Sequence, residues 1–314
     1  IYIDSKQFSN KYLFQKYNKV LKAEKLILTS KKNDSVKLGL FCWIDNDFKP
    51  ALSEWMAFKI NKLWEEKNKK NLINSSKSEQ NSFNSLCRRL NIDRSKKIIL
   101  INIRQSTKSL IKSIPDFRDY NPENLFHVLE QFNNYNFVII GDKIDHKFKT
   151  KNIHDYSNSS LKNKKNDVLL LLFADACIGS FSGPSHLAAI FGKPILYINC
   201  SQFWNFPVTE NSFFALSKFY KNNKKISQRD FLKIKPPLIW SNKDSLRSFN
   251  ISREFISKTE LKSFIFNFLE YINKKNIKIN YNNELIRYNW WNGDYSFFKN
   301  DNSMKNYFNA KVLK

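Results

Sequence analysis

The sequence predicts an α/β protein built on a parallel sheet, and its middle third carries the observations that support this class. Residues 96–104 (KKIILINIR) form an apolar run of the kind found in strands buried on both faces of a parallel sheet. Two further apolar runs, over 136–141 and 194–199, are separated by segments whose apolar residues recur at helical spacing. Strands and helices that alternate with short connections imply right-handed crossovers and helices on both faces of the sheet.

The N-terminal region carries weaker signals. Residues 23–30 and 36–44 have the composition of strands, and Pro50 is expected to begin a helix whose apolar residues form one stripe. The polar, Ser- and Asn-rich stretch over 68–82 is typical of a linker. A short helix over 83–90 is expected to follow it and to lead into the first strand of the sheet.

The later elements are predicted from their end signals. Asn121, Pro122 and Glu123 are a cap, a proline and an acid at the start of a helix. A capping box formed by Ser257 and Glu260 begins another helix. Between them we expect a strand over 136–141, a helix over 167–176, a strand over 177–180, a helix over 184–191 and a strand over 194–199. The tail from residue 290 is aromatic and polar and shows no assignable pattern.

Glycine is scarce in this chain, and its distribution points to one turn. Of six glycines, three fall in the stretch that begins at Gly179 and ends at Gly192. A strand is expected to end at Gly179, and the chain to turn through Ser182 and Gly183 into a helix. Such a turn lies at the carboxyl edge of a parallel sheet, where ligands of α/β proteins usually bind.

This turn has the features of an anion site. Gly183 lets a ligand approach the backbone, and the N–H groups of Ser185 and His186 point out of the helix N-terminus, where the dipole favours negative charge. Arg104 ends the first strand and Asp142 follows the next, so both lie on the same edge. We expect a diphosphate to be held by Arg104, Asp142, Ser180, Ser182, Gly183, Ser185 and His186. The alternatives are an ordinary turn without a ligand, and a His186 that packs inside the fold or acts as a base.

Two long stretches resemble a known group of enzymes. Residues 117–142 contain a helix followed by a VIIGD strand end, and residues 154–199 contain D-Y, S-G-P and G-K-P-I-L motifs. These motifs resemble the C-terminal half of bacterial glycosyltransferases encoded in surface-polysaccharide clusters, and residues 219–231 are similar to a later segment of that group. Heptosyltransferases have a related turn, in which Asp-Thr stands where this chain has Phe181 and Ser182.

The resemblance implies a GT-B fold, in which two Rossmann-like parallel-sheet domains face a cleft, here with a reduced N-terminal domain. The implied division is an acceptor-side α/β region over 1–95, a nucleotide-sugar-binding domain over 96–240 and a helical, aromatic tail over 241–314. By position, Asp155, Tyr156 and Ser157 would lie near the nucleoside. Enzymes of this type need no metal or cofactor, because protein groups stabilise the departing diphosphate.

The expected reaction transfers a sugar from a nucleotide-sugar donor to a surface-polysaccharide or lipid-linked glycan acceptor. Asp45 or Asp47, at a strand end in the N-terminal region, is a candidate base for the acceptor hydroxyl. Together with Asn46 they also spell D-x-D, a metal motif of the other glycosyltransferase architecture, but such a pattern is common by chance and a solvated loop is its preferred explanation. The alternative function is a non-catalytic GT-B-like protein that binds glycans or partners. A nucleotide-sugar epimerase would need an acid pair in the cleft, which the sequence does not show.

Charge and cysteine content limit the partners and the compartment. The net charge of +25 is spread along the chain, without helix-turn-helix, zinc-finger or RNA-platform signatures, so no nucleic-acid partner is expected. An AT-rich genome accounts for the abundant lysine, and attraction to an acidic membrane surface is the functional alternative. None of the four cysteines is in a C-x-x-C pair, and no apolar stretch approaches the roughly 20 residues of a spanning helix. We expect a cytoplasmic protein, with peripheral contact to the inner membrane.

Overall fold

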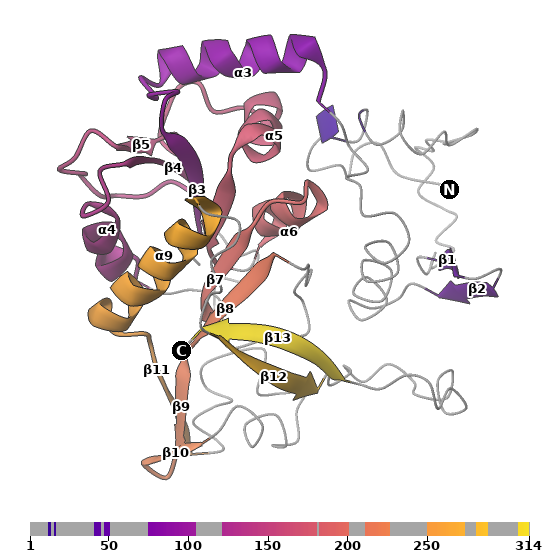
Figure 1. The fold of residues 1–314 in the computed structure, drawn as a ribbon, viewed down its shortest axis with the longest axis vertical. Coiled ribbons are helices and arrows are strands. Elements are labelled where there is room, and N and C mark those ends of the chain that lie inside the picture. Colours follow the sequence, from indigo (N-terminus) through magenta and orange to yellow (C-terminus); the bar gives the residue numbers. More distant parts are fainter. Residues whose placement is uncertain are drawn as a thin grey trace, which may run out of the picture.

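The computed structural model describes residues 12–13, 16, 41–44, 47–50, 75–104, 121–180, 182–200, 211–226, 250–273, 281–287 and 307–313 (Figure 1). The strand expected over 23–30 and the helix expected after Pro50 lie outside these residues. Pro50 itself ends a strand, because β1 (Phe41–Ile44) and β2 (Asp47–Pro50) form an antiparallel pair. The prediction that Pro50 begins a helix is therefore wrong.

The centre of the molecule is a sheet of eight strands in the order β12-β13-β8-β7-β6-β3-β4-β5. Six parallel strands that follow one another along the chain are β3 (Lys97–Ile103), β4 (Tyr135–Gly141), β5 (Ile153–Asp155), β6 (Ala176–Gly179), β7 (Ile195–Cys200) and β8 (Ser212–Leu216). Strand β13 (Tyr307–Leu313) adds to β8 in parallel, and β12 (Tyr281–Arg287) pairs with it in the antiparallel direction.

The order of the strands from β3 to β8 defines the class of the fold. Numbered along the chain from β3 to β8, they lie in the spatial order 3-2-1-4-5-6. This is the doubly wound Rossmann order, and it reverses between β3 and β6. The predicted α/β class with a parallel sheet is confirmed.

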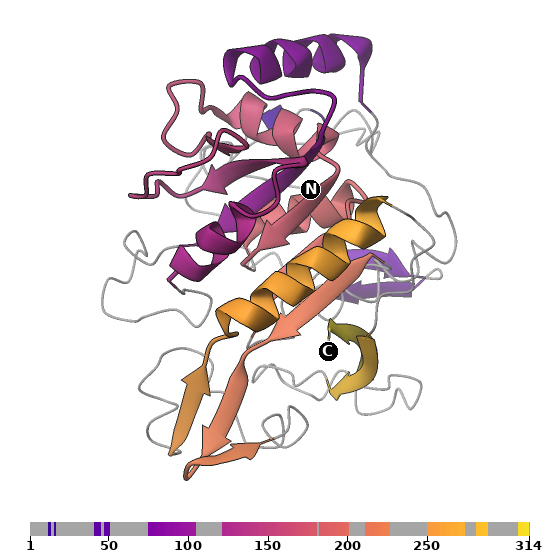
Figure 2. The ribbon, with the colours of Figure 1, turned by 60° about the vertical axis from the view of Figure 1, so that its left-hand side comes forward.

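Helices cover both faces of the sheet (Figures 1 and 2). One face packs against α3 (Lys77–Arg89), α5 (Lys164–Phe173) and α6 (Gly183–Ile190), and the other against α4 (Glu123–Leu129) and α9 (Lys258–Asn273). Strand β3 supplies both cores by alternation, since Ile98 and Leu100 belong to the first and Ile99, Ile101 and Ile103 to the second. The continuous apolar run is thus explained by burial on both faces.

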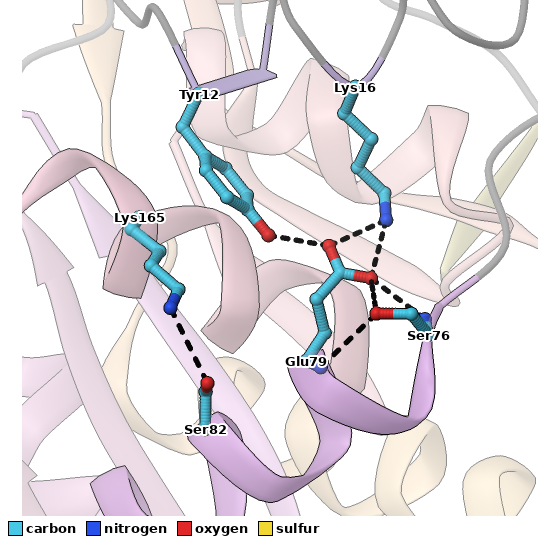
Figure 3. Close-up of polar contacts among 6 residues, drawn as sticks. All are labelled: Tyr12, Lys16, Ser76, Glu79, Ser82 and Lys165. Atoms are coloured by element: carbon cyan, nitrogen blue, oxygen red, sulfur yellow. Dashed lines mark hydrogen bonds and ion pairs between the residues drawn. The ribbon is translucent and has the colours of Figure 1, made fainter.

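Helix α3 begins six residues before the predicted helix, so residues 77–82 are not a linker. The cause is a capping box that the sequence reading missed. The Ser76 hydroxyl accepts from the Glu79 N–H at 3.2 Å, and the Glu79 carboxylate accepts from the Ser76 N–H at 2.8 Å (Figure 3). Short polar residues at this helix start satisfy its first N–H groups, which is why polarity here does not indicate a loop.

Glu79 also ties an N-terminal segment to this helix (Figure 3). Its carboxylate accepts from the Tyr12 hydroxyl at 2.5 Å and from the Lys16 ammonium at 2.7 and 2.8 Å. Burial alone would raise the pKa of Glu79, but the hydrogen bonds from Lys16, Tyr12 and Ser76 outweigh it and lower the pKa to about 2. The carboxylate is therefore ionised at neutral pH and fully used by its partners.

Other predicted elements are shifted by a few residues because their caps differ. Helix α4 starts at Glu123 with Pro122 as its N-cap, while the Asn121 side chain accepts from the Glu123 N–H at 3.0 Å. Helix α5 starts at Lys164, because the Asn163 side chain accepts from the Asn166 N–H at 2.9 Å. The capping box of Ser257 and Glu260 at the start of α9 is confirmed.

A smaller antiparallel sheet of β9 (Lys218–Lys221), β10 (Lys224–Ile226) and β11 (Ile251–Glu254) extends from the end of β8. Its hairpin turns through Asn222 and Asn223, both at positive φ.

The division of the chain at residues 95 and 240 stays a prediction. Helices α3 and α9, which flank the middle region, both pack on the main sheet. In the part of the chain that the structure describes, no helix has the length and apolarity needed to cross a bilayer.

Candidate functional site

The reversal of strand order places the candidate site between the carboxyl ends of β3 and β6. These strands are neighbours, with Asn102 paired to Gly179. At a reversal the two adjoining crossovers run to opposite faces of the sheet, which leaves a crevice above the strand ends. The turn from β6 into α6 and the residue after β3, Arg104, both lie at the carboxyl ends of these two strands. The sequence predicted the edge of the sheet, and the strand order now specifies the place along that edge.

Close backbone packing explains the glycine at the end of β6. Gly179 has a φ of +149°, and a Cβ there would lie 1.9 Å from the carbonyl oxygen of Asn102. By contrast, a Cβ on Gly183, the first residue of α6, would meet nothing within 4 Å. Gly179 is thus required by the packing of β6 on β3, whereas Gly183 borders open space at the helix N-terminus.

Asn102 organises the turn, and the sequence reading missed it. It is 1% exposed, and its side-chain nitrogen lies 3.1 Å from the Ser180 carbonyl oxygen, 2.6 Å from the Ser182 hydroxyl and 2.9 Å from the Ser185 hydroxyl. The Ser185 hydroxyl in turn donates to the Ser180 carbonyl at 2.7 Å. The available signal was a single amide residue inside an otherwise apolar strand, because a buried polar side chain must find partners.

The N-terminus of α6 is not capped by its own cap residue. Ser182 occupies the N-cap position, but its side chain makes no cap hydrogen bond and faces Asn102 instead. The first N–H groups of a helix have no partner within the helix. They carry the positive end of the helix dipole, so the first turn of α6 can receive an anion.

Charged residues lie at the carboxyl ends of β3 and β4. Arg104 is half-buried directly after β3, and its backbone N–H lies 3.5 Å from the Ser180 hydroxyl. Lys162, which no sequence motif indicated, donates to the carbonyl oxygen of Gly141 at the end of β4. Asp142 is half-buried one residue further on, at the strand next to β3. The carboxyl edge of β3 and β4 thus carries Arg104 and Lys162 as cations and Asp142 as a carboxylate.

The predicted diphosphate residues fall into two groups. Ser180 and Ser185 are buried and take part in hydrogen bonds that hold the turn. Ser182 and His186 are half-buried and Gly183 is exposed at the helix start. The His186 N–H donates to the Ser182 carbonyl at 3.2 Å, so the expectation that it points out of the helix N-terminus is wrong. The structure therefore brings together Arg104, Ser180, Ser182, Gly183, Ser185 and His186, with Asp142 one strand away.

The predicted nucleoside residues lie at the end of β5, the outermost parallel strand. Asp155 closes a turn by accepting from the Ser157 hydroxyl at 2.6 Å and from the Asn158 N–H at 3.1 Å. Tyr156 is 0% exposed, and its hydroxyl donates to the Asp167 carboxylate at 2.9 Å. Burial raises the pKa of Tyr156 above its usual range. A nucleoside contact here stays a prediction, and only Asp155 of the three is accessible to make it with a side chain.

Further groups lie away from this edge. Asp45 falls outside the described residues and Asp47 is the first residue of β2, so their catalytic role stays a prediction. Among the residues that the structure describes, no group of three or more His, Cys, Asp or Glu side chains is arranged to hold a metal ion. Cys87, Cys177 and Cys200 are buried free thiols, and burial raises the pKa of Cys177 to about 12, which keeps it unreactive.

A cavity of about 520 Å³ lies at the opposite, amino edge of the sheet, beside the last turns of α9. Lys96 and Lys97 line it, but their ammonium groups donate to the carbonyls of Asn133 at 3.0 Å and Ile272 at 3.1 Å. The amino edge of a parallel α/β sheet is not where ligands of this fold usually bind.

Comparison with known proteins gives distant structural likenesses only. No protein-family model matches the chain, and no curated protein matches it at a significant level. Among solved structures, a glycosyl transferase family 9 protein from Veillonella parvula DSM 2008 is 14% identical, with a TM-score of 0.40 over 64% of this chain and 53% of that one. The ADP-heptose LPS heptosyltransferase II of E. coli is also 14% identical, with a TM-score of 0.35 over 51% of each chain.

The heptosyltransferase TibC, solved with ADP-D-beta-D-heptose, is 15% identical with a TM-score of 0.31, over 56% of this chain and 46% of that one. This chain thus spans about half the length of the solved structures it matches. At this distance the likeness does not define a function, which has to come from the site.

Proposed function

We propose that this chain binds a nucleotide sugar through its diphosphate at the turn from β6 into α6 and transfers the sugar to a glycan acceptor. One observation carries the proposal: the uncapped N-terminus of α6 lies where the 3-2-1-4-5-6 strand order reverses, next to Arg104. In doubly wound sheets this is the position at which phosphate-bearing ligands bind.

The chemistry of the site suits a diphosphate leaving group. N–H groups of the first turn of α6, the Ser182 hydroxyl and the Arg104 guanidinium are all hydrogen-bond donors, and Gly183 leaves room beside them. Such donors stabilise negative charge as it develops on the departing diphosphate, and Arg can bind phosphate in a bidentate manner. No step of this scheme requires a metal ion, and we propose a metal-independent, GT-B-type enzyme.

The sugar-transfer part of the proposal is supported by the motifs over 117–142 and 154–199. Together with the site they favour a nucleotide-sugar donor over other phosphate ligands. We further propose a surface-polysaccharide or lipid-linked glycan as acceptor, with Asp45 or Asp47 as its base. A net charge of +25 would favour contact of the protein with an acidic inner-membrane surface, where lipid-linked acceptors are found.

The first test measures thermal stabilisation by nucleoside diphosphates and nucleotide sugars, with ADP-heptose in the panel. We expect one nucleotide family to stabilise the protein, and Arg104→Ala to weaken that ligand about tenfold or more, because a charge-assisted hydrogen bond is lost. Arg89→Ala, an exposed arginine in the last turn of α3, is the matched control and should bind like the wild type. No stabilisation by any member of the panel would contradict the proposed function.

Turnover separates an enzyme from a binding protein. Release of nucleoside diphosphate from the selected donor, in the presence of glycan acceptors and EDTA, is expected if the chain is a metal-independent transferase. If the donor binds but no nucleoside diphosphate is released, either under these conditions or after Mg²⁺ is added, the non-catalytic glycan- or partner-binding alternative is supported instead.

A further inference from the structure

The amide of Asn102 faces more acceptors than it has hydrogens. Its nitrogen carries two, and it lies within hydrogen-bond distance of one carbonyl and two hydroxyl oxygens, those of Ser180, Ser182 and Ser185. The Ser180 carbonyl can only accept, so the nitrogen and not the oxygen of the amide must face the turn. The amide oxygen points the other way, 3.2 Å from where a Cβ on Gly141 would stand.

This orientation determines what each serine hydroxyl does with its own hydrogen. The Ser185 hydroxyl donates its hydrogen to the Ser180 carbonyl at 2.7 Å, so this group is used entirely within the turn. The Ser182 hydroxyl accepts from Asn102 at 2.6 Å and makes no cap hydrogen bond to the helix. The hydrogen of the Ser182 hydroxyl is therefore donated neither to Asn102 nor to the helix. Because Ser182 is half-buried at the mouth of the turn, that hydrogen can reach a ligand.

We propose that Asn102 is a positioning residue that holds the turn from β6 into α6 and orients the Ser182 hydroxyl as a donor to a phosphate oxygen. The inference rests on the proposed function, since it assigns the Ser182 donor to the diphosphate of that ligand. Asn102 itself is buried and contacts no ligand; it acts through Ser182. Of the three serines at the turn, Ser182 binds the anion, whereas Ser180 and Ser185 maintain the backbone.

The chain offers a matched control for a substitution at Asn102. Asn136 is also a buried asparagine in a central strand, 2% exposed, and its amide nitrogen donates to the carbonyls of Asp93 at 2.7 Å and Lys96 at 3.3 Å. It lies at the amino end of β4, on the edge opposite the turn. Asn136→Asp introduces the same chemical change as Asn102→Asp with a comparable structural disturbance, but away from the proposed site.

The experiment measures affinity for inorganic pyrophosphate and for the nucleoside diphosphate selected in the panel, by calorimetry. Asn102→Asp replaces the donor with a carboxylate that takes the Ser182 hydrogen and repels the anion. We expect affinity to fall about tenfold or more in Asn102→Asp and in Ser182→Ala, and to change less than about threefold in Asn136→Asp. Wild-type affinity in Asn102→Asp, or equal losses in both asparagine variants, would overturn the proposal.

A pH series distinguishes positioning from general destabilisation. A buried carboxyl is protonated more readily than an exposed one. In its neutral form the carboxyl does not repel the anion, and its O–H can donate a hydrogen bond as the amide did. The affinity of Asn102→Asp relative to the wild type should therefore recover as the pH is lowered, whereas that of Ser182→Ala should not. A constant ratio across pH for Asn102→Asp would count against the proposal. Should Asn102→Asp fail to fold, Ser182→Ala still tests the proposal. Wild-type affinity in Ser182→Ala would show that the Ser182 hydroxyl does not donate to the ligand, and would overturn the proposal.

Hydrogen exchange without ligand tests the positioning role of Asn102 separately from the proposed function. If the wild type binds neither pyrophosphate nor any nucleotide, the proposed function fails and the Ser182 assignment fails with it. The positioning of the turn is then decided by exchange alone. Faster exchange over 182–190 in Asn102→Asp than in Asn136→Asp supports it, and equal exchange in the two variants overturns it.

Discussion

At the scale of single residues, two glycines a few positions apart have opposite roles. Gly179 is enclosed by the backbone of β3, whereas Gly183 faces open space at the helix start. The sequence predicted a ligand turn from the concentration of glycine there, but it could not assign these roles. The distinction depends on the pairing of Asn102 with Gly179, and residues 77 positions apart give no local signal of that contact.

Alanine at these two glycines should therefore separate stability from binding. Gly179→Ala places a Cβ against the carbonyl of Asn102 at a strained φ, and we expect a loss of about 3 kcal/mol or more in the free energy of unfolding. Gly183→Ala should change that free energy by less than about 0.5 kcal/mol, yet weaken nucleotide binding, because the methyl group stands where the ligand approaches. Urea unfolding and calorimetry of both variants check this; comparable stability losses would refute the assignment.

Tyr156 offers a second test at this scale. Its buried hydroxyl donates to Asp167 and also accepts from the Asn163 N–H at 3.1 Å. Tyr156→Phe should cost about 1–2 kcal/mol of unfolding free energy, because these partners are left unsatisfied. Nucleotide affinity should stay unchanged, as the side chain is enclosed in the core. A selective loss of nucleotide affinity with unchanged stability would instead place Tyr156 at the ligand.

At the scale of elements, the predictions are confirmed where the signal for a helix or strand lies in neighbouring residues. The capping box before α9 and the apolar run of β4 were both assigned from neighbouring residues. The start of α3 was missed because its capping box, Ser76 and Glu79, lies in a polar stretch resembling a linker. Strand β13 was missed because its partner β8 lies far away in the sequence, and a tail without alternation gives no sign of such pairing.

The Glu79 cluster should make the anchoring of the N-terminal segment sensitive to acid. Since the folded-state pKa of Glu79 is lowered to about 2, below its value in an unfolded chain, the cluster stabilises the fold above about pH 4.5. That contribution is lost as the pH falls from about 4.5 toward 2. Glu79→Gln should lower the unfolding free energy at pH 7 by about 1–3 kcal/mol.

Urea unfolding at pH 7 and pH 3 provides the measurement, and the gap between wild type and Glu79→Gln should narrow at the lower pH. Glu123→Gln is a suitable control, because Glu123 is an exposed acid in the first turn of α4. A gap that is the same at both pH values would show that ionisation of Glu79 does not contribute.

At the scale of the whole molecule, the parallel α/β class followed from the sequence but the strand order did not. Alternating strands and helices fix the class, because each crossover must bring the chain back in the same direction. Which strands become neighbours depends on side-chain packing between segments such as 97–103 and 176–179. Only that order shows that the turn from β6 into α6 lies at the reversal point, next to Arg104.

Hydrogen exchange with and without the ligand tests directly whether a nucleoside diphosphate binds at this reversal point. We predict that the nucleotide selected in the panel slows exchange over 179–190 and at the end of β3 near Arg104. Exchange around the amino-edge cavity, at Lys97 and Tyr135, should stay unchanged. Protection confined to the amino edge, or none over 179–190 at a saturating concentration, would contradict binding at the reversal point.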